Sequence, residues 1–224
     1  SSDLGLNQTC YGLICQELER GDSALRSTLS VQSSLVMWCI HQFGSEVQKK
    51  RWLPALATGE TIGCFGLTES HGGSDPSNMK TNAKPGINGW ILNGSKMWIS
   101  NGSISDVAVV WAQTPDGIRG FLVESESAGF ETHVIKNKFS LRASNTAELF
   151  FSDTPVPEES RLPGAEGLKP ALACLEQARY GVAWGAIGAA QACLAEVLDY
   201  TATRTLFGRT LSKTQLIQIR LADA

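Results

Sequence analysis

The spacing of apolar residues changes twice along the 224-residue chain, and this change constrains the fold more than any other feature. Residues 8–60 carry apolar side chains at helical intervals, whereas residues 61 to about 160 show short alternating runs separated by turn residues. From about 168 to 203 the helical spacing returns, and no proline follows Pro170, a residue suited to the start of a helix. The sequence therefore predicts an α+β chain in which a β module lies between two helical parts.

The central region contains the strongest turn signals. The stretch GWILNGSKMWIS predicts two strands around Asn93-Gly94, a dipeptide that tolerates the positive φ angles of a two-residue hairpin. A second hairpin is predicted in DVAVVWAQTPDGIRGFLVE, with its turn at residues 115–117. The proline-rich, polar stretch TPVPEESRLPGAEG predicts a linker to the second helical part. The predicted domains are residues 1–60, 61–165 and 166–224.

Helix signals also mark the two ends of the chain. Ser45 is expected to cap a charged helix that stops near Pro54 and Gly59. The final stretch, TQLIQIRLADA, is apolar at helical spacing and stops without a cap, and a helical pattern is already present at residue 8. We therefore expect the chain to be part of a longer polypeptide.

Composition and charge argue against several classes of function. Lysines and arginines are scattered singly in a chain of net charge −3, so no basic stripe is present to bind a nucleic acid. The six cysteines lack a C-x-x-C pair, which favours reduced thiols, and the three histidines show no paired-ligand spacing, so no metal site is expected. The apolar runs are interrupted by polar residues, so no membrane span is expected. Rossmann, Walker A and G-x-S-x-G motifs are absent.

The loop FGLTESHGGSDPS, residues 65–77, is dense in glycine and hydroxyl groups and offers many backbone N–H groups to a ligand. It could equally be an ordinary surface turn. The strand MWISNG follows it, and a tryptophan in a strand is more often a core residue than a platform for a cofactor. Each segment taken alone leaves both interpretations open.

Several segments together carry a family resemblance. In chain order, LTESHGGSD, GSKMWISN, FSLRAS, QARYGVAWG and TRTLFGRTL…TQLIQ resemble the signature segments of the acyl-CoA dehydrogenase superfamily. LRSTLSVQSSLVM and CFGLTE…GSDPS are most similar to its glutaryl-CoA dehydrogenase branch. The resemblance runs from about residue 8 to the end of the chain. It implies a helical N-terminal part, a central antiparallel β-barrel domain and the start of a C-terminal helical bundle.

The resemblance implies FAD as cofactor and nominates its contacts. Thr68 matches the position that hydrogen-bonds the flavin's pyrimidine edge, Trp98 the position that packs by the ring, and Ser100 the position near its reactive N5. Serine at position 100 replaces the threonine expected for the glutaryl branch but keeps the donor. The full predicted cofactor set is Phe65, Leu67, Thr68, Gly73, Ser74, Trp98, Ile99, Ser100, Arg204, Phe207 and Gln215.

Some of these positions have a plain structural alternative. Arg204 and Gln215 match residues that reach the FAD of a neighbouring subunit, and the resemblance therefore implies a homo-oligomer, usually a dimer of dimers. Judged on its own, Arg204 is a cation favoured at a helix C-terminus, and Gln215 is a polar surface residue.

The resemblance also nominates substrate contacts. Arg26 and Ser27 match a pair that faces the distal carboxylate of glutaryl-CoA, a group that a guanidinium holds well; a solvated helix arginine is the alternative. The stretch from Leu172 to Arg179 corresponds to the acyl-CoA channel, and Ser74 touches both ligands. The predicted substrate set is Arg26, Ser27, Ser74, Leu172, Leu175 and Arg179.

The implied reaction is α-proton removal from an acyl-CoA thioester by a glutamate, with hydride transfer from the β-carbon to flavin N5 and, in the glutaryl branch, loss of CO2 to give crotonyl-CoA. The position of that base lies beyond Ala224, and Glu69 and Asp75 match no catalytic position. Electron transfer flavoprotein is the implied acceptor, in the mitochondrial matrix or the bacterial cytoplasm. A non-catalytic flavin- or acyl-CoA-binding fragment and an acyl-CoA oxidase are the alternatives.

Overall fold

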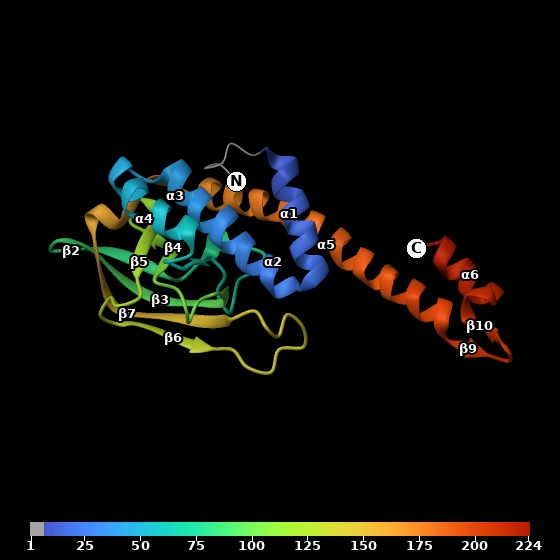
Figure 1. Cartoon of the computed structure of the whole chain (residues 1–224). Coiled ribbons are helices and arrows are strands. Elements are labelled where there is room, and N and C mark those ends of the chain that lie inside the picture. The colour runs from blue at the N-terminus through green and yellow to red at the C-terminus, as the bar shows by residue number, and fades with distance from the viewer. Residues whose placement is uncertain (1–6) are drawn as a thin grey trace. The chain divides into compact units, whose positions relative to one another are not determined.

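The computed structural model describes residues 7–224, which divide into two compact units (Figure 1). The larger unit is Ser27–Tyr180, and the smaller one combines the stretch up to Arg26 with Gly181–Ala224. Two helices, α2 (Ser23–Ser30) and α5 (Lys169–Thr203), each contribute residues to both units. Each unit is described by itself.

The larger unit is built on an eight-stranded sheet with the order β6-β7-β3-β2-β4-β5-β8, in which β1 also pairs with β4. The pairing is antiparallel except where β4 meets β1 and β2. The strands are β1 (Gly63–Gly66), β2 (Asn82–Gly86), β3 (Gly89–Ser100), β4 (Val107–Thr114), β5 (Gly117–Glu124), β6 (Phe130–Val134), β7 (Thr146–Pro157) and β8 (Arg161–Glu166).

Helices cover one side of this sheet. The π-helical segment Val31–Met37 continues α2 and leads into α3 (Trp38–Phe43) and α4 (Glu46–Thr58). Figure 1 shows α3 and α4 above β4 and β5. Ile40 and Leu56 from these helices share a buried apolar cluster with Trp111 and Leu122 of the strands, and a second cluster that includes Leu149 forms between strands alone. Burial of these side chains is the main force that joins the helices to the sheet.

The predicted cap of α4 is confirmed, and one of its predicted stop signals is wrong. Ser45 accepts a hydrogen bond from the Gln48 backbone while the Gln48 side chain accepts one from the Ser45 backbone, which completes a capping box. Pro54 lies inside the helix, which ends at Thr58 before Gly59. The last turn persists past the proline because Leu56 is buried in the core.

The stretch with Asn93-Gly94 forms one long strand rather than the predicted hairpin. It is β3, which pairs with both β2 and β7 and carries a register shift between Leu92 and Gly94. The turn that does occur, between β2 and β3, lies at residues 86–89. Gly94 has φ 140°, and a Cβ there would lie 2.6 Å from the Cα of Thr81. The glycine therefore serves a bulge and a close backbone approach.

The predicted hairpin with its turn before Gly117 is confirmed as β4 and β5. The predicted linker TPVPEESRLPGAEG is wrong: it contains the end of β7, a short 3-10 turn (Glu158–Ser160) and β8. Leu162 and Ala165 are fully buried, which stabilises β8 despite its proline. The strand lies at the end of the pairing path, where a missing N–H is tolerated.

The smaller unit contains α1 (Gln8–Gly21), the part of α5 from Gly181 onward, a hairpin of β9 (Thr205–Leu206) and β10 (Arg209–Thr210), and α6 (Gln215–Ala222). The helices predicted for residues 8–20 and for the last residues are confirmed. Helices α1 and α5 approach closely, because a Cβ on Gly188 would lie 2.0 Å from the carbonyl oxygen of Gln16. The hairpin was not predicted.

Helix α5 contradicts the expectation that interruptions keep every apolar run too short to span a membrane. It spans 35 residues, and no charged residue occurs between Arg179 and Glu196. Within residues 7–224 it is long and apolar enough, by length and composition alone, to cross a membrane. A helix in the core of a soluble protein passes the same test, so the finding by itself assigns no location.

Candidate functional site

A cavity of about 310 Å³ lies within the larger unit, in the size range of small-molecule sites. The loop after β1, the end of β3, the segment that follows α2 and the first turns of α5 form its walls. The lining residues are Val31, Leu35, Phe65, Leu67, Thr68, Gly73, Ser74, Pro76, Trp98, Ile99, Ser100, Leu172, Leu175 and Arg179.

The cavity gathers most of the predicted site residues. It contains the predicted cofactor residues from Phe65 through Ser100 and, from the substrate set, Ser74, Leu172, Leu175 and Arg179. Sequence reasoning missed Val31, Leu35 and Pro76. The two aliphatic residues have helical spacing and carry no signal that distinguishes a cavity wall from a core. The roles of all these residues stay predictions.

The predicted residues outside the cavity lie at several places. Arg26 is buried and its Nε donates to Oε2 of Glu19 at 2.5 Å. Arg204 follows α5, Phe207 occupies the tip of the β9–β10 hairpin, and Gln215 begins α6. These residues belong to the smaller unit. Ser27 belongs to the larger unit and does not line the cavity.

The first wall of the cavity is the loop that carries Thr68 and Ser74. The backbone N–H of Met97 donates to the Thr68 carbonyl at 2.9 Å, which joins the loop to β3. Glu69 and Gly72 exchange two backbone hydrogen bonds and form a tight turn. Further along, Asp75 accepts hydrogen bonds from the side chains of Ser77 and Asn78, which lower the pKa of Asp75. The loop is therefore an organised structure rather than an open turn.

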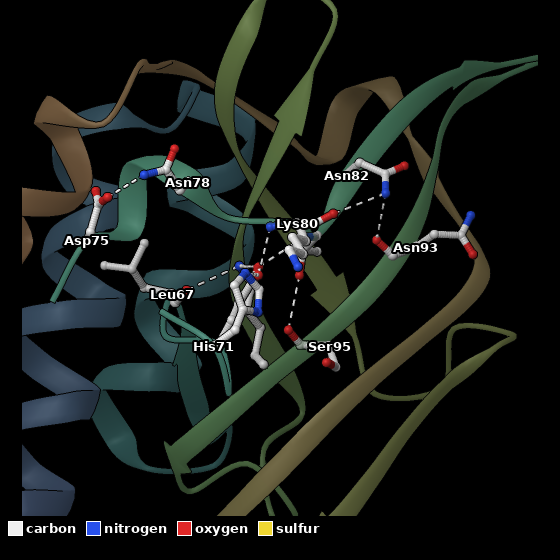
Figure 2. A network of polar contacts seen from close by, with 11 residues as sticks. Leu67, His71, Asp75, Asn78, Lys80, Asn82, Asn93 and Ser95 are labelled. Atoms are coloured by element: carbon white, nitrogen blue, oxygen red, sulfur yellow. Dashed lines mark hydrogen bonds and ion pairs between the residues drawn. The ribbon is translucent and has the colours of Figure 1, made fainter. Parts of the chain in front are cut away.

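A buried ion pair lies behind this wall (Figure 2). Lys96 Nζ is 2.8 Å from Glu69 Oε1, and the two side chains are 0% and 3% exposed. Glu69 also accepts hydrogen bonds from the backbone N–H groups of Lys80 and Thr81, and His71 Nε2 lies 3.4 Å from its Oε2. Figure 2 shows Leu67, His71, Lys80 and Ser95 around this network.

Both members of the pair are charged at neutral pH. Burial opposes the ionisation of Glu69, but hydrogen bonds from Lys96, Thr81 and the Lys80 backbone, with the Lys96 charge, outweigh it and lower the pKa of Glu69 to about 2. Burial lowers the pKa of Lys96 to about 8, and the hydrogen bond and charge of Glu69 oppose that shift. Glu69 is therefore a poor proton acceptor.

Trp98 has an unusual conformation at the second wall. Its φ is 62°, and the register of β3 shifts between Lys96 and Ile99. Trp98 is 56% exposed, whereas Ile99 is buried. A left-handed backbone is strained for a bulky residue, and such strain concentrates at binding sites. The bulge presents an aromatic ring at the cavity.

A second cavity of about 500 Å³ meets the first at Trp98 and Ser100 and continues to residues 135–146. That loop carries Lys136, Lys138 and Arg142, and Lys138 Nζ donates to Thr146 Oγ1 at 2.6 Å. The segment FSLRAS, which lies in this loop, contributed to the family resemblance, but none of its residues was predicted as a contact. The two cavities together offer an aromatic face, hydroxyl donors and a cationic end.

This donor set fits FAD, a long ligand with a planar ring, a polar ring edge and an anionic pyrophosphate. Thr68, Ser74 and Ser100 are hydroxyl donors beside the apolar surfaces of Phe65 and Trp98. Among residues 7–224 no group of three or more His, Cys, Asp or Glu side chains could hold a metal ion.

Comparison with known families agrees with this assignment. Three family models match: "Acyl-CoA dehydrogenase, N-terminal domain" over residues 3–60, "Acyl-CoA dehydrogenase, middle domain" over 64–154 and "Acyl-CoA dehydrogenase, C-terminal domain" over 165–224. The predicted superfamily and fold class are thereby confirmed. The domain boundaries stay a prediction.

Three similar proteins illustrate the range of relatives. The chain is 38% identical to the mitochondrial short-chain specific acyl-CoA dehydrogenase of Rattus norvegicus, over 99% of this chain and 55% of that protein. It matches a Mycobacterium smegmatis glutaryl-CoA dehydrogenase in complex with FADH2 at 52% identity and a TM-score of 0.97, over 98% of this chain and 57% of that one. It matches butyryl-CoA dehydrogenase from Megasphaera elsdenii at 38% identity and a TM-score of 0.94, over 99% and 60%.

The chain thus spans little more than half the length of these relatives. The comparisons confirm FAD as the cofactor of the family. They include both a glutaryl-CoA and short-chain enzymes, so they do not decide between these substrates.

Proposed function

The chain belongs to the acyl-CoA dehydrogenase family, and on this premise we propose that it binds FAD and an acyl-CoA thioester as part of an oxidoreductase. The proposed reaction removes the α-proton of the thioester and transfers a hydride from its β-carbon to the flavin. The observation that carries the proposal is the cavity at Thr68, Ser74 and Trp98–Ser100, which joins segments far apart in the sequence.

When bound, FAD supplies the hydride acceptor of this reaction. Thr68 and Ser100 would donate hydrogen bonds to the polar edge of the ring, which favours the negative charge of the reduced flavin. Trp98 would cover part of the ring and exclude water. Leu172, Leu175 and Arg179 of α5 would line the path of the acyl-CoA.

We assign no base within the 224 residues. Glu69 is committed to an ion pair and three further contacts, and Asp75 lies at the surface with its pKa lowered by Ser77 and Asn78. Following the family pattern, we place the catalytic glutamate in sequence that follows Ala224.

Glutaryl-CoA is our first candidate substrate, with decarboxylation to crotonyl-CoA. The support is the 52% identity to a glutaryl-CoA dehydrogenase and the Arg26-Ser27 pair that the family resemblance places at the substrate carboxylate. A short-chain monocarboxylic acyl-CoA is the second candidate. It is favoured by the ion pair between Arg26 and Glu19, since this contact already balances the guanidinium charge.

Electron transfer flavoprotein is the proposed electron acceptor, and a homo-oligomer in the mitochondrial matrix or the bacterial cytoplasm is the proposed form. In that assembly Arg204, Phe207 and Gln215 would contact FAD across a subunit interface. A non-catalytic binding fragment and an oxidase remain as alternatives that measurement can separate.

The test is an anaerobic visible spectrum of the intact natural polypeptide with FAD, before and after addition of glutaryl-CoA or butyryl-CoA. Bleaching of the flavin band by either thioester supports the dehydrogenase, and the faster substrate identifies the class. Bound FAD that neither thioester bleaches would leave only the binding fragment. Rapid oxygen consumption by the reduced, product-bound protein would indicate the oxidase, and glutaconyl-CoA without CO2 would contradict decarboxylation.

A further inference from the structure

One buried carboxylate joins the two ends of the loop that forms the first cavity wall. Glu69 stands near the start of this loop, and its Oε2 and Oε1 accept hydrogen bonds from the backbone N–H groups of Lys80 at 2.7 Å and Thr81 at 3.0 Å. Between these points the chain carries Gly73, Ser74 and Pro76, which line the cavity. The carboxylate therefore fixes the span of the loop at its base.

Lys96 joins this loop to the second wall. Its Nζ donates to Glu69 Oε1 at 2.8 Å and to the Leu67 carbonyl at 3.2 Å. Lys96 lies on β3 two residues before Trp98, the first of the three cavity residues on that strand. Leu67 directly precedes Thr68, whose carbonyl accepts the Met97 N–H. One ammonium group thus ties the hydroxyl-bearing wall to the aromatic wall.

We propose that the Glu69–Lys96 ion pair positions the flavin-binding walls, holding Thr68 and Ser74 at a fixed separation from Trp98 and Ser100. The inference rests on the proposed binding of FAD. Both side chains are buried, and neither belongs to the cavity lining, so they act through their neighbours as positioning residues.

The energetics favour a positioning role over a purely stabilising one. A buried ion pair loses most of its Coulombic gain to desolvation, so an apolar pair of similar volume would stabilise the fold about as well. An apolar pair could not accept hydrogen bonds from the N–H groups of Lys80 and Thr81, and it could not donate one to the Leu67 carbonyl. The charged pair makes all of these contacts at once, and this fixes the geometry of the loop.

The test uses the intact natural polypeptide with three variants: Glu69→Gln, Lys96→Met and the double variant. Each single variant leaves one buried charge without its partner, whereas the double variant leaves none, so the double variant tests the proposal even if the single variants do not fold. Arg51→Met is the matched control, because it removes an exposed ion pair of the same unit, with Glu124, that lies outside the cavity.

The readouts are the FAD dissociation constant, measured well below the melting temperature of each variant, and the visible circular dichroism of the bound flavin. We expect the double variant to bind FAD about tenfold or more weakly, with an altered flavin spectrum, while Arg51→Met binds within about twofold of the unsubstituted protein.

A merely structural role predicts a different pattern. The double variant and Glu69→Gln would then change the melting temperature while the FAD dissociation constant and the flavin spectrum stay the same, and this result would overturn the inference. Failure of the unsubstituted protein to bind FAD would instead overturn the proposed function, and this inference with it.

Discussion

Two ion pairs with little exposure to solvent, Glu69–Lys96 in the larger unit and Glu19–Arg26 in the smaller one, differ in the groups that hold them in place. The Glu69 carboxylate accepts from Lys96 and from two backbone N–H groups, whereas the contact that holds Glu19 comes from the side chain of Arg26. The first pair is closed, with each group committed to the fold. The second joins a carboxylate to a guanidinium, a group that can also bind the carboxylate of another molecule. The comparison teaches that burial of a charge does not by itself distinguish scaffold from site.

The largest expected effect comes from breaking the closed pair on one side. Lys96→Met leaves the Glu69 carboxylate buried without its cation, and we expect unfolding in urea to show a loss of about 3–5 kcal/mol. The double variant with Glu69→Gln should recover much of that loss. If Lys96→Met alone lowered the free energy of unfolding by less than about 1 kcal/mol, the loss would be no larger than for an exposed ion pair. That result would contradict the interpretation of Glu69–Lys96 as a closed pair.

Acid should weaken the same pair. The pKa of Glu69 is about 2 in the folded chain against a usual value of 4.5, so in this window the unfolded chain binds more protons. Stability from Glu69 is therefore fully present above pH 4.5 and lost as the pH falls toward 2. The shift corresponds to on the order of 3 kcal/mol. Denaturant titrations across this range should show a smaller acid-dependent loss in Glu69→Gln; equal losses would contradict the assignment.

The Glu19–Arg26 pair should affect substrate choice more than folding. Arg26→Gln removes a charged donor, so we expect kcat/KM for glutaryl-CoA to fall about 10- to 100-fold, while that for butyryl-CoA changes less than about threefold. Steady-state assays with both thioesters on one preparation measure this split. Equal losses for the two substrates would remove Arg26 from carboxylate recognition.

The smallest effect is expected at the surface. Arg51 pairs with Glu124, and both side chains are about half exposed. Arg51→Met should cost no more than about 1 kcal/mol, and added salt should reduce the difference. A loss as large as that of Lys96→Met would show that burial is not what separates these pairs.

Local signals in the sequence predicted much of the fold. The cap at Ser45, the hairpin before Gly117 and the long helix after Pro170 follow from residues near in sequence, and each is confirmed. The hairpin predicted at Asn93-Gly94 was wrong because the same dipeptide also suits a bulge. The close approach of Thr81 to Gly94 favours the bulge over the hairpin. The predicted linker was wrong for a similar reason, since an edge strand is defined by its pairing with a distant strand.

The sequence likewise predicted some features of the candidate site and missed those that depend on contacts between distant residues. The family pattern predicted Thr68, Ser74 and Trp98 as site residues, and one cavity contains them. It did not predict the Glu69–Lys96 pair, whose members are 27 residues apart and meet only in the fold. Nor did it predict the left-handed backbone of Trp98, because a register shift in β3 depends on pairing with β7.

The most direct test of the central claim is a crystal structure of the intact natural polypeptide with FAD. The account predicts electron density for the flavin ring between the loop of Thr68 and Ser74 and the strand end Trp98–Ser100, with the Glu69–Lys96 contact kept. Density for the ring at another place on the protein, with this cavity holding only solvent, would contradict it.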